Sequence, residues 1–254
     1  MTLRLLLVDA LNLVRRIHAA VPEGDGDALC LRCQQALRKA LNLHQPSHAI
    51  LVWDGGHEQS WRRRLYPDYK AQRKPMPEDL AQLLPRLRAE MEATGIRSVQ
   101  QADVEADDLI GTIAHKVAQH GGQVMILSTD KGFGQLHCDA IGQWDHFAGS
   151  AIDADSLQSR VGVAPAQLLD FWALAGDSGN GIPGVPGIGK KTAQKLLSEY
   201  GSLAQLFAGP LPEGKLGEKL AHHQQQARMS YALVRLRRDL QLGLDLKQFR
   251  RETP

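Results

Sequence analysis

The chain has 254 residues, of which 43% are hydrophobic and 23% are charged, and its formal net charge at pH 7 is +2. These are ordinary values for a globular protein, and they exclude a disordered tail, a collagen-like rod and a disulfide-rich miniprotein. The length fits one large domain or a domain with a smaller appendage. A net charge this small says nothing about a nucleic-acid partner, so the distribution of charge matters more than its total.

Cysteine usage and hydropathy bear on where the protein works. No apolar run approaches the roughly 20 residues of a membrane span, and only three cysteines occur, which favours a reducing compartment. Cys30 and Cys33 have the spacing of redox and zinc sites, but no second pair follows them. Both lie in a predicted amphipathic helix, so we favour simple packing. We expect a cytoplasmic monomer with no membrane partner.

Short apolar runs alternate with helical patterns over the first 160 residues. Strands are predicted at residues 2–8, 48–53 and 123–128, and helices at 27–43, 77–94 and 105–120. This alternation predicts an α/β fold, with a twisted, mainly parallel sheet built from right-handed crossovers and flanked by helices. We assign residues 1–160 to this core, with a basic arch at about 60–80.

The pattern changes after residue 160. Helices are predicted at 163–175, 192–200 and 218–238, and no strand is evident before the tail. Between the first two helices, the Gly/Pro-rich stretch 176–189 has apolar residues interleaved through it, which indicates a hairpin loop and not a linker. Residues 161–254 therefore form a mostly helical part, with a surface loop at 209–217.

Carboxylates follow the three predicted strands and open the helix at residue 105. Open α/β sheets bind ligands at the carboxyl edge of their strands, and a helix dipole favours acids in its first turn. Each acid alone fits a cap or a turn, but together they would repel one another unless a cation neutralises them. Oxygen ligands suit Mg²⁺ or Mn²⁺. These six predicted metal-site residues are Asp9, Asp54, Glu105, Asp107, Asp108 and Asp130.

The segment 61–74 is strongly basic. It contains six Lys or Arg, one acid and three of the chain's aromatic residues. Basic groups neutralise phosphates and aromatic rings stack on bases, so the segment predicts a nucleic-acid contact. The alternative is a solvated surface segment, which is the usual setting of a charge run.

The glycine-rich segment 184–193 has two interpretations. A P-loop requires a preceding strand and a Ser or Thr where Lys191 stands, and neither is present. A helix–hairpin–helix fits better, because its glycines let a phosphate approach backbone amides at the start of the next helix. Lys190, Lys191 and Thr192 would lie beside that phosphate, and carbonyls of the tight turn would be available to a monovalent cation.

Six short segments occur in the order found in a known superfamily. They are Leu7–Asp9, Val52–Asp54, Tyr69–Pro77, Glu105–Asp108, Ser128–Lys131 and Gly176–Gly189. In this order the chain resembles the 5′-nuclease superfamily, which includes the flap endonucleases and the 5′→3′ exonuclease domain of bacterial DNA polymerase I. The resemblance spans roughly residues 3–195, and the short chain is similar to the exonuclease IX-type members. The fold it implies is the PIN-like nuclease core followed by a helix–hairpin–helix.

The resemblance implies structure-specific 5′ flap endonuclease activity on branched DNA, with metal-dependent phosphodiester hydrolysis. It implies Asp107 as a direct Mg²⁺ ligand, Lys70 and Arg73 as contacts to the scissile phosphate, and Asp130 in the catalytic set. Asp177 would hold a second ion through water. The implied K⁺ site consists of the carbonyls of Leu174, Ala175, Pro183, Val185 and Ile188. The implied DNA contacts are Tyr69, Gly187, Ile188, Gly189, Lys190, Lys191 and Thr192.

Two departures from the superfamily pattern remove carboxylates of its second metal site. The family has Asp-Lys-Asp where this chain has Asp130–Gly132, and Gly-Asp-x-x-Asp where it has Gly176–Asn180. The exonuclease IX-type members share this depletion. One alternative is therefore a DNA-binding protein that has lost catalysis. Another is an RNA nuclease of the related fold, against which the helix–hairpin–helix counts.

Overall fold

The structure is a computed structural model, and it describes residues 2–56 and 58–251. The chain forms two compact units. Unit 1 comprises Met1–His57, Pro75–Ile152 and Arg237–Pro254, and unit 2 comprises Glu58–Lys74 and Asp153–Leu236. The basic segment thus belongs to the same unit as the C-terminal helices, and the end of the chain belongs to the unit that holds the sheet.

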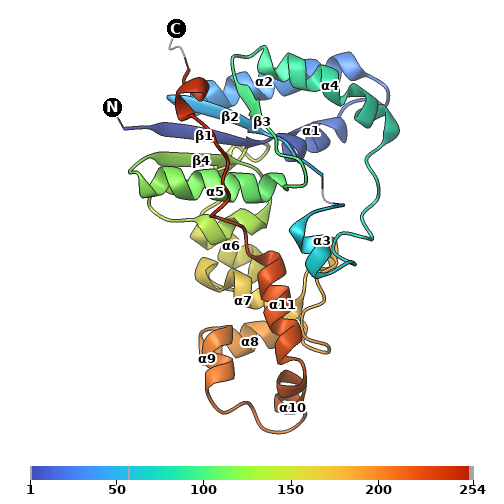
Figure 1. The fold of residues 1–254 in the computed structure, drawn as a ribbon, viewed down its shortest axis with the longest axis vertical. Coiled ribbons are helices and arrows are strands. Elements are labelled where there is room, and N and C mark those ends of the chain that lie inside the picture. The colour runs from blue at the N-terminus through green and yellow to red at the C-terminus, as the bar shows by residue number, and fades with distance from the viewer. Residues whose placement is uncertain (1, 57, 252–254) are drawn as a thin grey trace. The chain divides into compact units, whose positions relative to one another are not determined.

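Unit 1 contains a six-stranded sheet in the order β3-β2-β1-β4-β5-β6 (Figure 1). All neighbours are parallel except β5 and β6. The strands are β1 (Arg4–Asp9), β2 (His48–Val52), β3 (Arg97–Val99), β4 (Gln123–Leu127), β5 (Ile141–Asp145) and β6 (Ser150–Ala151). The order reverses between β1 and β4, which is the topological switch point where open α/β sheets bind their ligands.

Helices cover both faces of this sheet (Figure 1). They are α1 (Ala10–His18), α2 (Gly26–His44), α4 (Glu78–Glu92) and α5 (Ala106–Gln119), with 3₁₀ turns η1 (Lys131–Leu136) and η4 (Leu246–Phe249). Because strand side chains alternate between faces, Leu6, Val8 and Leu51 pack in one cluster with α1, α2 and α4. Leu5 and Leu7 are buried on the opposite face, along which α5 packs. The predicted α/β fold is confirmed.

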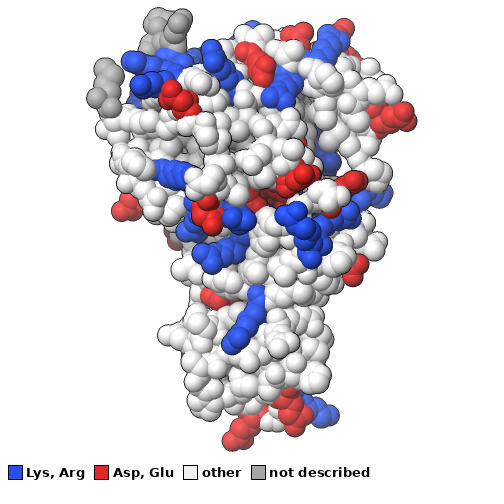
Figure 2. All heavy atoms as spheres, in the orientation of Figure 1, with Lys and Arg blue, Asp and Glu red and all other residues white. Residues whose placement is uncertain are grey.

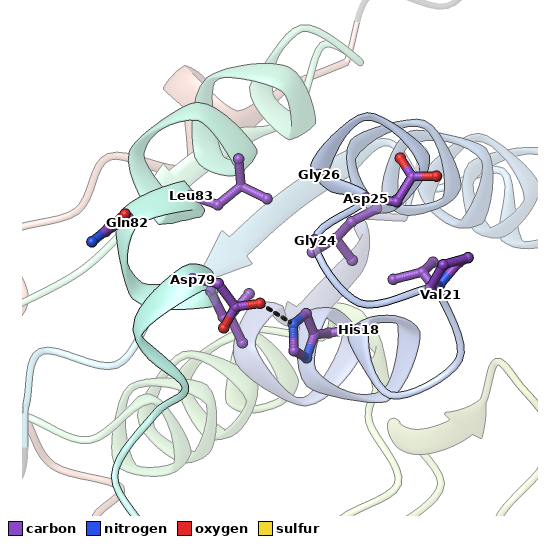
Figure 3. Close-up of a pocket in the computed structure, with 11 residues that line it drawn as sticks. His18, Val21, Gly24, Asp25, Gly26, Asp79, Gln82 and Leu83 are labelled. Atoms are coloured by element: carbon purple, nitrogen blue, oxygen red, sulfur yellow. Dashed lines mark hydrogen bonds and ion pairs between the residues drawn. The ribbon is translucent and has the colours of Figure 1, made fainter.

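Side-chain caps fix the helices on the first of these faces. The carboxylate of Asp25 accepts a hydrogen bond from Ala28 N and starts α2. His18, at the end of α1, lies 3.2 Å from Asp79 in the first turn of α4, across a pocket of about 270 Å³ (Figure 3). Cys30 and Cys33 are free and buried in α2, as the packing interpretation expects.

Unit 2 is helical in the part of the chain that the structure describes. Its helices are α3 (Trp61–Leu65), α6 (Ala154–Val161), α7 (Leu168–Ala175), α8 (Lys190–Tyr200), α9 (Leu203–Ala208), α10 (Lys215–His222) and α11 (Gln224–Val234), with 3₁₀ turns η2 (Pro165–Gln167) and η3 (Ser178–Asn180). Helix α7 packs against α8 and α11. None of the helices described in either unit is long and apolar enough to cross a membrane.

Several predicted elements need correction. The expected helix 218–238 is two helices, because the backbone at His223 (φ −109°, ψ 20°) leaves helical geometry between α10 and α11. The expected loop 209–217 ends in α10, where Gly217 is buried and approaches the carbonyl of Pro212. The expected helix 163–175 begins as a 3₁₀ turn at Pro165. The strands β3, β5 and β6 were not predicted, since none of them is a continuous apolar run.

Candidate active site and nucleic-acid interface

Two carboxylates meet at the switch point of the sheet in unit 1. Asp9 ends β1 and Asp130 lies three residues beyond β4, and Ser128 joins them. The Ser128 hydroxyl donates to Asp9 Oδ2 (2.9 Å) and accepts from Asp130 N (3.2 Å). Asp9 also caps α1, because its Oδ1 accepts from Asn12 N (3.1 Å). The carboxylate of Asp9 is therefore held in place by two neighbouring elements.

A buried amide fixes the loop that carries Ser128 and Asp130. Gln143 in β5 donates from Nε2 to the carbonyls of Ser128 (2.9 Å) and Asp130 (2.7 Å), and its Oε1 lies 3.1 Å from His137 Nε2. On the other side of the loop, Thr129 donates from its amide and its hydroxyl to Asn12 Oδ1, both at 3.2 Å. Sequence reasoning missed these supports. The one available signal was the polar residue Gln143 at an inward-facing position of β5, a strand that the sequence did not predict.

The loop after β2 brings Asp54 to the segment that leads to Glu105. A Cβ on Gly55 would lie within 1.7 Å of the carbonyl oxygen of Gln101, so only glycine permits the approach. Gly55 N donates to Val104 O (3.0 Å), and Asp103 N donates to Gly55 O (3.1 Å). Glu105 is buried and is the N-cap residue of α5. The acids of two separate motifs are thereby fastened together through backbone contacts.

The first turn of α5 carries the remaining two predicted acids. Asp107 is half-buried, whereas Asp108 is fully buried and its Oδ1 accepts from Arg237 N (2.9 Å). Thr112, one turn later, donates from its hydroxyl to Arg237 O (3.1 Å). The carboxylate of Asp108 thus serves at least in part to anchor the segment after α11.

The electrostatics of the site oppose full ionisation. The pKa of Asp9 is raised to about 6, chiefly by burial and also by the charges of Asp130 and Asp54, against hydrogen bonds from Asn12 and Ser128 that lower it. Within the described residues, no three His, Cys, Asp or Glu side chains form a ready-made metal cage. Neighbouring carboxylates that do not surround a metal position fit Mg²⁺, because this ion keeps several of its waters and binds only one or two carboxylates directly.

In unit 2, the basic segment is folded onto the C-terminal helices. Arg62 is only 2% exposed and donates from Nε to the carbonyl of Leu233 (2.8 Å) and from Nη2 to that of Arg235 (3.0 Å). Tyr69 is 4% exposed and packs with Ile182 and Leu233. In this conformation Arg62 is a structural anchor and the ring of Tyr69 is not available for stacking on a base.

Lys70 and Arg73, the residues expected to contact the scissile phosphate, both form hydrogen bonds with Asn180. Lys70 has a positive φ of 55°, and its backbone N donates to Asn180 O (2.8 Å). Its Nζ lies 5.0 Å from the centre of the Tyr69 ring. Arg73 donates from Nη2 to Asn180 Oδ1 (2.6 Å). Asn180 Nδ2 in turn donates to Asp177 Oδ2 (2.6 Å), so Asp177 and Arg73 are linked through one amide.

Two glycines let the hairpin close on the end of α7. Gly176 (φ 74°) and Gly184 (φ 63°) approach each other so closely that a Cβ on Gly184 would lie 2.3 Å from Gly176 N. This brings Leu174 and Ala175 beside Gly184. Of the expected K⁺ ligands, the carbonyl of Leu174 accepts from Val185 N (2.8 Å) and that of Val185 accepts from Ile188 N (3.0 Å). Each carbonyl keeps a second lone pair.

The start of α8 has the features of a phosphate site. Gly189 is its N-cap residue and no side chain caps the helix, so the amides of its first turn face outward without a side-chain acceptor. Lys190, Lys191 and Thr192 form this turn. A third lysine, Lys219 of α10, lies over Gly187, where a Cβ would be 2.6 Å from its Nζ. No local pattern points to Lys219, which is far from the hairpin along the chain.

Family models account for nearly the whole chain. Residues 4–162 match the N-terminal resolvase-like domain of 5′-3′ exonucleases, and residues 163–254 match the C-terminal SAM fold of the same proteins. The chain belongs to the 5′-3′ exonuclease family. The resemblance found in the ordered motifs is therefore confirmed.

Curated relatives and solved structures agree with this assignment. The chain is 52% identical to flap endonuclease Xni of Shewanella amazonensis (97% of this chain, 98% of the relative) and 48% identical to that of Shewanella oneidensis (99% and 96%). Its fold is similar to a T5 5′-exonuclease with bound zinc (TM-score 0.77, 20% identity, 91% and 89% covered). It is also similar to the catalytic core of Rad2 in complex with DNA (TM-score 0.57, 15% identity, 95% and 81% covered).

Proposed function

We propose that this protein is a structure-specific 5′ flap endonuclease, which hydrolyses phosphodiester bonds of DNA near the flap junction. The observation that carries the proposal is the pair Asp9 and Asp130, joined by Ser128 at the switch point of the sheet. Near 50% identity over almost the full length to proteins named flap endonuclease Xni supports the same substrate class. Its three free cysteines fit the cytoplasm as the place of action.

The acidic cluster of unit 1 has the donor chemistry for Mg²⁺, with Mn²⁺ as a substitute. Asp107 would be a direct ligand, and the other acids would bind the ion directly or through water. When bound, the ion polarises the phosphate and makes a water molecule a better nucleophile. The supporting observation in this chain is that Asp9 is buried beside two other carboxylates. Burial is the main cause of its raised pKa, and the charges of Asp130 and Asp54 add to it, a repulsion that a cation would relieve.

The residues of unit 2 would bind the DNA. Lys70 and Arg73 would stabilise the negative charge that develops on the scissile phosphate, for which Arg73 has to exchange its partner Asn180. The amides and side chains at the start of α8 would hold a phosphate of the duplex, with the carbonyl K⁺ site beside them. Asp177, already bonded to Asn180, would reach a second ion only through water.

A second candidate is a DNA-structure-binding protein without catalysis. It is favoured by Gly132 and Asn180, which stand where the family pattern has carboxylates. Asn180 is engaged by Arg73 and Asp177, and a Cβ on Gly132 would lie 3.1 Å from Asp130 Oδ1. At both positions the side chain that the family pattern requires for a second metal is absent, and in unit 2 Asn180 is occupied by hydrogen bonds to Arg73 and Asp177.

The test is cleavage of an end-labelled 5′-flap duplex in Mg²⁺ and K⁺ by the wild type, by Asp107→Ala, and by Asp155→Ala. Asp155 is a matched control, since it is an exposed acid in the first turn of α6. We expect cleavage near the junction that is lost in Asp107→Ala and kept in Asp155→Ala, with flap binding retained by all three. Tight flap binding without cleavage by the wild type would instead favour the non-catalytic binder.

A further inference from the structure

A basic hollow lies at the amino ends of strands β2 and β3, whereas the carboxylates follow the carboxyl ends of the strands. It has a volume of about 760 Å³ and is lined by the turn from Thr94 to Arg97 and by the tail from Lys247 to Arg251. Arg97 begins β3, and the carboxylates follow the carboxyl ends of their strands. A six-residue strand spans about 20 Å, so the hollow is separate from the candidate active site.

The tail is held in place where it lines the hollow. Arg251 N donates to Ser47 O (2.9 Å), and Arg250 forms an antiparallel bridge with His48 at the start of β2. Phe249 is 6% exposed and anchors the segment. The wall of the hollow is therefore built onto the sheet by backbone hydrogen bonds and burial.

Positive charge dominates this lining. Four of its side chains are cationic, namely Arg97, Lys247, Arg250 and Arg251, and no described acid lines it. In the part of the chain that the structure describes, none of the four forms an ion pair. The neighbouring acid, Asp245, accepts from Lys247 N (3.0 Å). Figure 2 shows Lys and Arg side chains gathered at this end of unit 1, near η4.

The chemistry of the lining selects a phosphate ligand. Arginine forks match phosphate oxygens and lose little on desolvation, and the hollow presents three of them. A protein partner would need an apolar anchor, because interface energy is concentrated in buried aromatic and aliphatic contacts. The hollow offers none among its described residues, since the one large apolar residue in its lining, Phe249, is only 6% exposed.

We propose that this hollow binds phosphates of the DNA backbone, as a contact additional to the hairpin and the active site. The inference rests on the proposed function, because it takes DNA as the substrate. The amino and carboxyl ends of the strands are about 20 Å apart. A duplex that runs parallel to the strands would contact both the hollow and the carboxylates over roughly six base pairs, at about 3.4 Å for each base pair.

The experiment compares Arg97→Gln/Arg250→Gln with Arg38→Gln/Arg160→Gln, a control that removes the same charge at two exposed positions. Binding of a labelled 30-base-pair flap duplex to the full chain is measured without divalent ions over a range of KCl concentrations. We expect the slope of log Kd against log[KCl] to fall by about 1.8 in the first variant, roughly 0.9 for each phosphate that is no longer neutralised, and to stay unchanged in the control.

Equal slopes in the two variants would overturn the proposal. Inorganic phosphate at constant ionic strength separates the two sources of the ligand. Phosphate that lowers the wild-type slope to that of the variant competes with DNA at the hollow and supports the DNA contact. If the two slopes are equal and phosphate raises the melting temperature of the wild type but not of Arg97→Gln/Arg250→Gln, the hollow is a free-phosphate site and the DNA contact is refuted. Thermal unfolding checks that the variants fold. The proposed function is tested separately by flap cleavage, so a wild type without cleavage that still shows the slope difference would refute only the catalysis.

Discussion

The guanidinium of Arg73 and the side-chain amide of Asn180 are 2.6 Å apart, and the same amide donates to Asp177 at 2.6 Å. An amide can serve both partners because it has a donor and an acceptor, whereas a carboxylate has only acceptors. Asn180 therefore joins the basic segment to the hairpin at a position where the family pattern has an acid.

Asn180→Asp should create a cation site that the wild type lacks. The new carboxylate would stand 2.6 Å from that of Asp177, and this repulsion is relieved by a divalent cation. We expect Mn²⁺ to raise the melting temperature of Asn180→Asp more than that of the wild type. The added acid in Asn42→Asp, at an exposed position of α2, should produce no such gain. Equal Mn²⁺ effects in all three proteins would contradict the prediction.

The acids of unit 1 were accessible to sequence reasoning because parallel strands end at one edge of a sheet. The apolar runs of β1, β2 and β4 are continuous, so the positions of Asp9, Asp54 and Asp130 followed from them. The strand β5 alternates Ile-Gly-Gln-Trp-Asp and has no apolar run, so it was missed. For the same reason no sequence pattern indicated the role of Gln143, which holds the loop of Asp130 by a hydrogen bond to the Asp130 carbonyl.

The burial of charged and aromatic side chains in unit 2 could not be predicted from the sequence pattern. Arg62, Arg63 and Arg64 are consecutive and chemically identical, yet only Arg62 is buried against carbonyls of the C-terminal segment. Those carbonyls come from residues about 170 positions away, and a local pattern contains no such information. Tyr69 is buried for the same reason, by Ile182 and Leu233.

Ser128→Ala should impair cleavage but not DNA binding. The variant removes a hydroxyl that donates to buried Asp9 (2.9 Å), and a hydrogen bond to a charged group is worth about 1.5–3 kcal/mol. If the orientation of Asp9 matters to the reaction, the cleavage rate should fall by about tenfold or more. Ser128→Thr keeps the donor and should restore part of the rate, while Ser150→Ala, at an exposed position, should behave as wild type. A normal rate in Ser128→Ala would exclude this positioning role.

Lys219→Ala should weaken DNA binding through the hairpin. Its Nζ lies over Gly187, close to the start of α8, so it would neutralise the phosphate held there. The slope of log Kd against log[KCl] should fall by about 0.9, the effect of one phosphate that is no longer neutralised. Lys39→Ala, at an exposed position of α2, should leave the slope unchanged, and an identical decrease in both variants would argue against a specific role for Lys219.

Replacing K⁺ by tetramethylammonium at constant ionic strength should weaken DNA binding, because a large organic cation cannot enter a ring of carbonyls. Gly184→Ala should abolish the difference between the two salts, since a Cβ there would clash at 2.3 Å with Gly176 N at a φ of 63°. Gly209→Ala is the matched control, with no atom closer than 3.7 Å to the new Cβ. Equal wild-type affinity in both salts would rule out the proposed carbonyl site.

Asp170 should make the protein less stable as the pH rises. Burial raises the pKa of this carboxyl above its ordinary value of 3.8, against a hydrogen bond from the amide of Leu203 that lowers it. The folded state therefore holds the proton more tightly than the unfolded state. Its contribution to the free energy of unfolding is fully present below pH 3.8 and is lost as the pH rises through the folded-state pKa.

Asp170→Asn removes this titration and keeps an acceptor for Leu203. Urea unfolding between about pH 4 and pH 7 should show the variant gaining stability relative to the wild type as the pH rises. Asp155→Asn, at an exposed site of the same unit, corrects for the loss of one charge. If the difference in the free energy of unfolding between Asp170→Asn and the wild type stays constant over this range, burial does not disfavour the charged form of Asp170 and the prediction is wrong.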